Sequence, residues 1–179
     1  MTELGSVTWP PAPSRTERLV LREPEARDRA AFIELHASPE VHTYLGGPRS
    51  RDELEHEMPE VPGLRPGSFV VDLDGAMIGQ ILLRRAAEHR RPAAVGKVDL
   101  GYLFLPSAWG FGYATEACAA ALDWFDGTLP GEPVVLTTQT ANVGSIRLAA
   151  KLGFTEVERF RAWDAEQWLG LRPPVTPSA

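Results

Sequence analysis

Cysteine is nearly absent from this chain, and this scarcity excludes a fold held together by disulfides. Cys118 is the only cysteine among 179 residues, so no internal disulfide can form and a reducing compartment is expected. It lies among alanines and no histidine is suitably placed beside it. This pattern indicates a small buried apolar side chain rather than a catalytic nucleophile.

Metal-ligand patterns are absent from the sequence as well. The four histidines show no His-x-x-x-His spacing, and there is no Cys-x-x-Cys pair. These are the patterns that hold zinc and similar ions. We therefore expect no metal site.

Basic charge and long apolar runs are also scarce. Lys97 and Lys151 are the only lysines and the formal net charge is −6, which argues against the basic face that nucleic-acid binding requires. No apolar run approaches the ~20 residues of a membrane span, and the first residues lack the pattern of a secretion signal. We expect a soluble, cytoplasmic protein without nucleic-acid or membrane partners.

The length of the chain predicts one domain with short tails. Residues 1–15 contain three prolines and no periodic pattern, so they are expected to form an N-terminal arm. Residues 16–171 are the expected domain and residues 172–179 the expected C-terminal tail. The oligomeric state stays open between a monomer and a homodimer.

Hydrophobic periodicity and turn residues predict the elements of this domain. Helices are expected over 25–37, 50–58, 110–126 and 142–152, and strands over 18–23, 68–73, 76–83, 95–105, 133–138, 154–163 and 167–171. Asp74-Gly75 predicts a hairpin turn. Ser50, in a capping box with Glu53, and Asn142 are expected to cap helices, and Gly127 to end one. This order of elements predicts an α/β or α+β domain with a mixed sheet.

Two glycines one residue apart, Gly110 and Gly112, follow a predicted strand and begin a predicted helix. The N–H groups at a helix N-terminus attract anions, and glycine lets the backbone approach a ligand closely. Taken alone, the pair fits any phosphate or an ordinary turn. A dinucleotide-binding fingerprint would need a third glycine where this chain has Thr115.

Three segments together resemble a known family. The segment "LGYLFLPSAWGFGYATEA" at 100–117 resembles the acetyl-coenzyme A motif of the GNAT superfamily of N-acetyltransferases. This motif resembles in particular the branch of the ribosomal-protein N-terminal (alanine/serine) acetyltransferases, and "TERLVLRE" at 16–23 resembles the opening strand of that branch. "NVGSIRLAAKLGF" at 142–154 resembles the second conserved motif of the superfamily. The resemblance implies a mostly antiparallel sheet of six to seven strands with about four helices, whose fourth and fifth strands splay apart.

The resemblance also implies a set of residues that bind acetyl-coenzyme A as the cosubstrate. The pyrophosphate would lie on the amides of the glycine loop, and the pantetheine arm between the splayed strands, where a bulge at Gly101 is expected. One of the amides of the fourth strand would donate to the oxyanion. The implied binding residues are Leu103, Phe104, Leu105, Trp109, Gly110, Phe111, Gly112, Tyr113, Ala114, Thr115, Asn142 and Ser145. Trp109 stands where the family usually has Gln or Arg.

Attack of an amine on a thioester requires a base for the ammonium proton and an acid for the leaving thiolate. Asp99 stands where related sequences often have a glutamate, and it is either that base or a solvated strand carboxylate. Ser145 is either the acid or a second residue of the helix cap. Ala149 replaces the tyrosine that is the acid in many family members.

Two functions follow from these residues. The first is an acetyl-CoA-dependent N-acetyltransferase in which a primary amine, of a protein N-terminus or a small molecule, attacks directly. The second is a non-catalytic acyl-CoA-binding or regulatory module. Asp164 and Glu166, between Trp163 and Trp168, could hold a cationic amine, although the tryptophans also suit the core.

Overall fold

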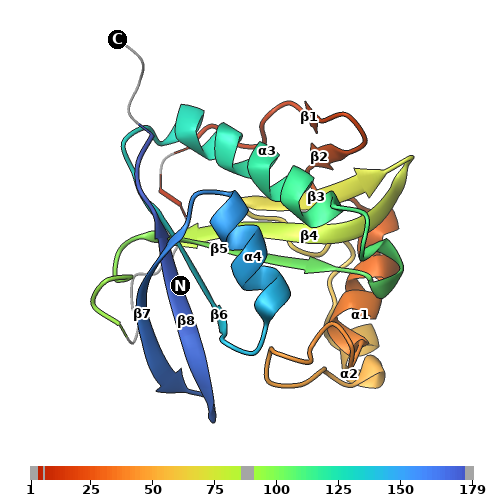
Figure 1. Cartoon of the computed structure of the whole chain (residues 1–179). Coiled ribbons are helices and arrows are strands. Elements are labelled where there is room, and N and C mark those ends of the chain that lie inside the picture. Colours follow the sequence, from red (N-terminus) through yellow and green to blue (C-terminus); the bar gives the residue numbers. More distant parts are fainter. Residues whose placement is uncertain (1–3, 6, 86–90, 176–179) are drawn as a thin grey trace.

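The structure is a computed structural model that describes residues 4–5, 7–85 and 91–175. Parts of the predicted arm (1–3 and 6), of the loop before the 95–105 strand (86–90) and of the predicted tail (176–179) lie outside the described residues. The described residues form one sheet of eight strands in the order β1-β2-β3-β4-β5-β6-β8-β7 (Figure 1). The strands are β1 Ser14–Arg15, β2 Val20–Arg22, β3 Ser68–Leu73, β4 Ala76–Arg85, β5 Val98–Phe104, β6 Val134–Gln139, β7 Thr155–Ala162 and β8 Ala165–Arg172.

Neighbouring strands run antiparallel except for β5 and β6, which run parallel. The helices are α1 Arg29–Ala37, α2 Arg51–Glu57, α3 Tyr113–Thr128 and α4 Val143–Lys151, with short 3-10 turns at Ala26–Asp28 and Pro106–Ala108. This is the predicted mixed fold with four helices. The sheet has one strand more than expected, because β1 lies in the segment that carries no periodic pattern.

Alternating side chains on β3 place the helices on opposite faces of the sheet. Phe69 and Val71 belong to the main core cluster, which includes Phe125 of α3, whereas Val70 packs with Phe32 of α1. Successive residues of a strand point to opposite faces. Thus α3 and α4 cover one face, and α1 covers the other (Figure 1). Cys118 is fully buried, as its alanine-rich surroundings predict.

Leu4 and Trp9, from the segment expected as an arm, pack onto this domain. Leu4 is only 1% exposed and belongs to the main core cluster. Trp9 makes edge-to-face contacts with Phe69 and Trp124, at 5.2 and 5.6 Å between ring centroids. The segment expected as an arm therefore contributes apolar area to the same core.

Three local predictions have different outcomes. Asp74 and Gly75 both have positive φ, of 52° and 92°, and form the predicted hairpin turn. The prediction for Gly127 is wrong, because α3 continues through it to Thr128. Ser50 does precede α2, but its side chain makes no capping hydrogen bond, so the predicted capping box is absent.

Candidate functional site

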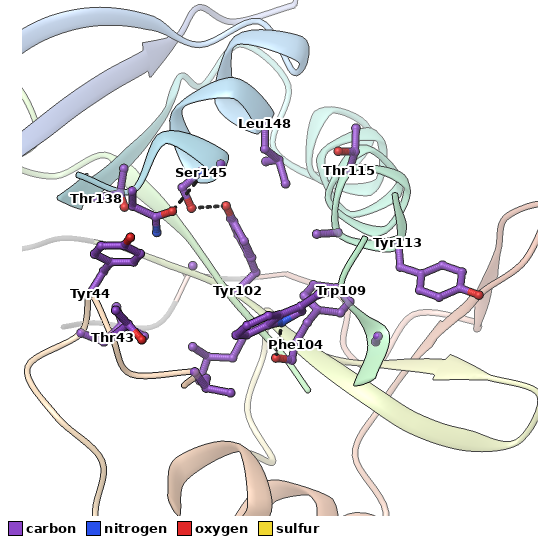
Figure 2. A pocket seen from close by; sticks show the side chains of 18 of the residues that line it. Thr43, Tyr44, Tyr102, Phe104, Trp109, Tyr113, Thr115, Thr138, Ser145 and Leu148 are labelled. Atoms are coloured by element: carbon purple, nitrogen blue, oxygen red, sulfur yellow. Dashed lines mark hydrogen bonds between the residues drawn. The ribbon is translucent and has the colours of Figure 1, made fainter. Parts of the chain in front are cut away.

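A split in the sheet between β5 and β6 forms the candidate site. The two strands pair only at Val98–Val134 and Asp99–Val135, although β5 continues to Phe104 and β6 to Gln139. This is the predicted splayed pair. A cavity of about 610 Å³ lies along the split, and its wall comes from the 40–45 loop, β5, β6 and the first turns of α3 and α4 (Figure 2).

The register of β5 decides which of its backbone groups reach the split. The Leu105 N–H donates to the Ile78 carbonyl at 2.9 Å, so it is used by β4 and does not face the cavity. Alternation along a strand turns the Leu103 amide to the same side and the Phe104 amide to the split. The pairing of β5 with β4 is continuous through Gly101, so the bulge expected there is absent. The interior glycine leaves the ladder regular.

The glycine loop ends in a helix N-terminus without an internal cap. Gly110 and Gly112 have φ of 86° and 81°, a conformation that L side chains rarely adopt. Gly112 is the N-cap of α3 and provides no side-chain acceptor, and the first helical bond is Glu116 N–H to the Gly112 carbonyl. The amides of residues 113–115 therefore have no partner inside the helix, and the positive end of its dipole faces the cavity.

Trp109 has a different role from the residue it replaces. Its indole Nε1–H donates to the Phe104 carbonyl at 2.9 Å, and the side chain remains 48% exposed. The bond ties the beginning of the glycine loop to the end of β5 (Figure 2). Trp109 thus anchors the loop on the strand.

Hydrogen bonds and an ion pair from Thr16 and Arg18, which precede β2, hold the outer side of the glycine loop. Arg18 donates from Nη1 to the Phe111 carbonyl at 2.9 Å and pairs with Glu116 at 2.7 Å. Its guanidinium lies 4.5 Å from the Tyr113 ring centroid. Glu116 also accepts bonds from the Arg18 N–H and the Thr16 hydroxyl. Desolvation raises the pKa of its carboxyl, but the bonds from Thr16 and Arg18 together outweigh it and lower the pKa. The Phe111 carbonyl is consequently held away from the cavity.

The N-terminus of α4 is capped by its own chain. The Asn142 side-chain oxygen accepts a bond from the Ser145 N–H at 3.2 Å, as predicted for a helix cap. The Ser145 hydroxyl in turn hydrogen bonds to the Tyr102 hydroxyl (Figure 2). Burial raises the pKa of Tyr102 to about 12, although the bond to Ser145 opposes this shift. The site therefore contains a half-buried pair of hydroxyl groups that sequence reasoning did not pair.

Asp99 lies where the β5–β6 pairing ends, and it does not line the cavity. Desolvation by the surrounding sheet raises its pKa to about 7, while Arg84 opposite it on β4 lowers it. Leu100, the next residue, points into the core with α3, so Asp99 points to the opposite face. The structure does not bring Asp99 and Ser145 together on one face of the sheet.

Most of the residues predicted to bind the cofactor line the cavity. Leu103, Phe104, Trp109, Gly110, Gly112, Tyr113, Ala114, Thr115, Asn142 and Ser145 line the cavity, whereas Leu105 and Phe111 do not. Asp164 and Glu166, considered as a site for an amine, lie outside the lining, and Trp163 is 61% exposed while Trp168 is buried.

Sequence reasoning missed the residues that come from distant segments. Glu40, Tyr44, Tyr102 and Thr137 all line the cavity. A loop after α1 brings Glu40 and Tyr44 to the split, and no local pattern marks them. Tyr102 could have been found from alternation, since it lies one residue after Gly101 on the predicted strand.

Comparison with known proteins agrees with this geometry. Residues 18–155 match the model of the acetyltransferase (GNAT) domain family. The chain belongs to the GNAT acetyltransferase family. The L-amino acid N-acetyltransferase AaaT of Escherichia coli K12 is 28% identical over 143 residues, which cover 78% of this chain and 84% of AaaT.

Solved structures of GNAT proteins share the fold. A Bacillus anthracis GNAT-family acetyltransferase aligns with a TM-score of 0.73 and 20% identity, over 90% of this chain and 98% of its own. The acetyltransferase AAC(6')-Ib, solved with ribostamycin and coenzyme A, aligns with a TM-score of 0.66 and 15% identity, over 88% and 94%. The branch of ribosomal-protein acetyltransferases stays a prediction.

The described residues offer neither a metal cluster nor a membrane-spanning helix. No described group of three or more His, Cys, Asp or Glu side chains is arranged to hold a metal ion. Among the same residues, no helix combines the length and apolar character needed to span a bilayer.

Proposed function

We propose that this GNAT protein is an acetyl-CoA-dependent N-acetyltransferase that acetylates a primary amine. The observation that carries the proposal is the uncapped N-terminus of α3 beside the split between β5 and β6. An uncapped helix N-terminus suits a pyrophosphate, and an open strand edge suits an extended arm that carries amide groups. Family membership supports the same cosubstrate.

The residues present fit coenzyme A well. The amides of residues 110–115 would hold the pyrophosphate, with the Thr115 hydroxyl beside them, and the Asn142 Nδ2 group would contact the pantetheine arm. Bound acetyl-CoA supplies an activated acetyl thioester. The Phe104 N–H, rather than that of Leu105, would donate to the oxyanion, a contribution of about 3 kcal/mol where such donors have been removed.

Proton transfer is assigned to groups on the two faces of the sheet. Asp99, with a pKa of about 7, would accept the ammonium proton directly or through water. Ser145, bonded to the Tyr102 hydroxyl, would protonate the thiolate from the face covered by α4. The tyrosine that Ala149 replaces thus has a functional substitute from β5.

Two classes of acceptor are candidates. The motif resemblance to the ribosomal-protein branch favours the α-amine of a protein N-terminus, and the name of AaaT points to an amino acid. Both classes present a primary amine to the same cavity.

The proposal is tested by cofactor binding and turnover. Gly112→Trp is expected to abolish coenzyme A binding in calorimetry, because the side chain blocks the backbone and strains φ. Gly127→Ala, an exposed interior position of α3 with open space around it, is the matched control and should bind normally. Unchanged affinity of Gly112→Trp would refute this placement of the pyrophosphate.

Catalysis is measured separately, as thiol release from acetyl-CoA across a panel of amines. Turnover with at least one amine is expected. Tight coenzyme A binding without turnover of any amine would overturn the enzyme and support the acyl-CoA-binding module.

A further inference from the structure

The cavity contains very few charged groups. Among the residues that the structure describes, Glu40 is the only charged side chain in its lining, and no Lys, Arg or His contributes. The remainder of the wall is aromatic, aliphatic, hydroxyl or amide. The described part of the lining therefore offers an acceptor one negative charge, that of Glu40, and no positive charge.

Glu40 is available to a ligand. Three other carboxylates of this region are paired: Glu34 with Arg51, Glu55 with Arg29 and Glu57 with Arg49. The Glu40 carboxylate forms no ion pair or hydrogen bond with any described side chain, and it is exposed at the mouth of the cavity. A cationic amine would therefore find an unneutralised partner there.

A second observation indicates the uncharged part of the acceptor. The Thr137 Oγ1 atom is buried and has no hydrogen-bond partner among the described residues, and Thr137 lines the cavity. A buried polar atom without a partner costs free energy that a ligand can recover by donating or accepting a bond. Leu136, the preceding residue of β6, points into the core under α3. Because successive strand residues point to opposite faces, the Thr137 side chain lies on the face covered by α1. The 40–45 loop packs on that face through Val41.

We infer that the acceptor is a primary amine with one positive charge and no carboxylate, which carries a neutral hydrogen-bonding group such as an amide. This inference rests on the proposed N-acetyltransferase function. A free amino acid would bring a carboxylate next to the cofactor's phosphates, into a cavity whose described lining contains no cation. A polyamine or aminoglycoside would bring several charges to the single carboxylate of that lining, Glu40, since Asp99 lies outside it.

Matched acceptors test the inference directly. Thiol release is measured with alaninamide, alanine and spermidine at saturating acetyl-CoA, and kcat/KM is expressed per protonated amine, the form that Glu40 would attract, so that different amine pKa values do not create a preference. We expect kcat/KM for alaninamide to exceed that for alanine by at least tenfold, and to exceed that for spermidine. Equal or higher values for alanine or spermidine would overturn the inference.

Variants assign the selection to Glu40. Glu40→Gln should raise KM for alaninamide about threefold to tenfold and leave kcat and coenzyme A affinity unchanged, because the carboxylate attracts the amine but takes no part in proton transfer. Glu53→Gln, an exposed carboxylate of α2 outside the cavity, is the matched control. An unchanged KM in Glu40→Gln would overturn the role of Glu40. If the enzyme acetylates alaninamide, alanine and spermidine equally well, only this inference is contradicted. If it acetylates no amine, the proposed function is contradicted as well.

Discussion

At the scale of single residues, burial gives two groups properties that their identity does not predict. Asp99 is an ordinary carboxylate in the sequence, yet the sheet around it raises its pKa to about 7. Tyr102 has the hydroxyl group that Ala149 lacks, and it reaches Ser145 from another element. Alternation along the strand could have indicated Tyr102 as a cavity residue, but the raised pKa of Asp99 and the pairing of Tyr102 with Ser145 depend on neighbours far away in the chain, which no local pattern reveals.

Replacing Asp99 should change stability and activity in opposite directions. The pKa of Asp99 is raised from 3.8 to about 7, so the folded protein binds this proton more tightly than the unfolded chain. The resulting stability is present below about pH 4 and is lost as pH rises through about 7. Asp99→Asn should therefore raise Tm relative to wild type at pH 8 more than at pH 4. As the proposed base, its loss should lower kcat about 100-fold or more.

Melting curves and rates at several pH values check this prediction. A Tm difference between Asp99→Asn and wild type that does not vary with pH would contradict the raised pKa. Retained kcat would remove Asp99 as the base and leave it a strand carboxylate.

The hydroxyl pair gives a second residue-scale prediction. Tyr102→Phe and Ser145→Ala should each lower kcat tenfold or more with little change in KM, because both groups act on the leaving thiolate. The double variant should be little worse than either single variant, since the two hydroxyls act as a unit. Steady-state kinetics of the three variants measure this. Additive losses would show that the two hydroxyls act independently.

At the scale of elements, Arg18, just before β2, holds the glycine loop at the N-terminus of α3 in place. Arg18 holds the Phe111 carbonyl outward and pairs with Glu116 on the first turn of α3. When that carbonyl is turned away, the amides of the loop can face an anion together. Arg18 is thus expected to position the loop without contacting the cavity, whose lining does not include it.

Arg18→Ala should weaken coenzyme A binding about tenfold in calorimetry while kcat at saturating acetyl-CoA stays within about twofold. Arg18→Lys should not restore affinity, because a lysine cannot bond the Phe111 carbonyl and Glu116 together in the geometry of a guanidinium fork. Arg51→Ala, which removes an exposed pair with Glu34, is the control. Full recovery in Arg18→Lys would reduce the role of Arg18 to its charge.

At the scale of the whole molecule, Leu4 belongs to the same hydrophobic core as the central sheet. Leu4 is 1% exposed in the cluster that also contains Phe69 and Leu83. Gly67, against which Leu4 packs, has a positive φ of 89° and lies close to the Leu83 carbonyl. The core under α3 is therefore closed by a segment that sequence patterns assign to an arm.

Leu4→Ala should accordingly lower the free energy of unfolding by about 2–4 kcal/mol, as for other buried leucines. Val157→Ala on the edge strand β7, where the side chain is 49% exposed, should cost less than about 1 kcal/mol. Urea unfolding of both variants gives the comparison. A loss at Leu4 no larger than at Val157 would show that the N-terminal segment contributes little to the core.

Prediction from sequence succeeded where local chemistry decides the structure. Asp74-Gly75 and Asn142 combine a required backbone conformation or cap with a suitable residue, and both behave as expected. Gly127 failed because packing of the surrounding helix outweighs the preference of one glycine. The glycine loop was found from its motif, but Glu40 and Thr137 reach the cavity only through the topology of the sheet, which no single segment encodes.

The two helices that border the cavity differ in how their first turns are satisfied, and this difference has a consequence for amide hydrogen exchange. The Ser145 amide is bonded to Asn142 within the chain, whereas the amides of Tyr113, Ala114 and Thr115 have no such partner. In the free protein these three amides should exchange with deuterium quickly and that of Ser145 more slowly. Coenzyme A should slow exchange at α3 and leave the Ser145 amide nearly unchanged, so exchange mass spectrometry would report cofactor binding at one helix and not at the other. Equal protection at both helices would contradict this assignment.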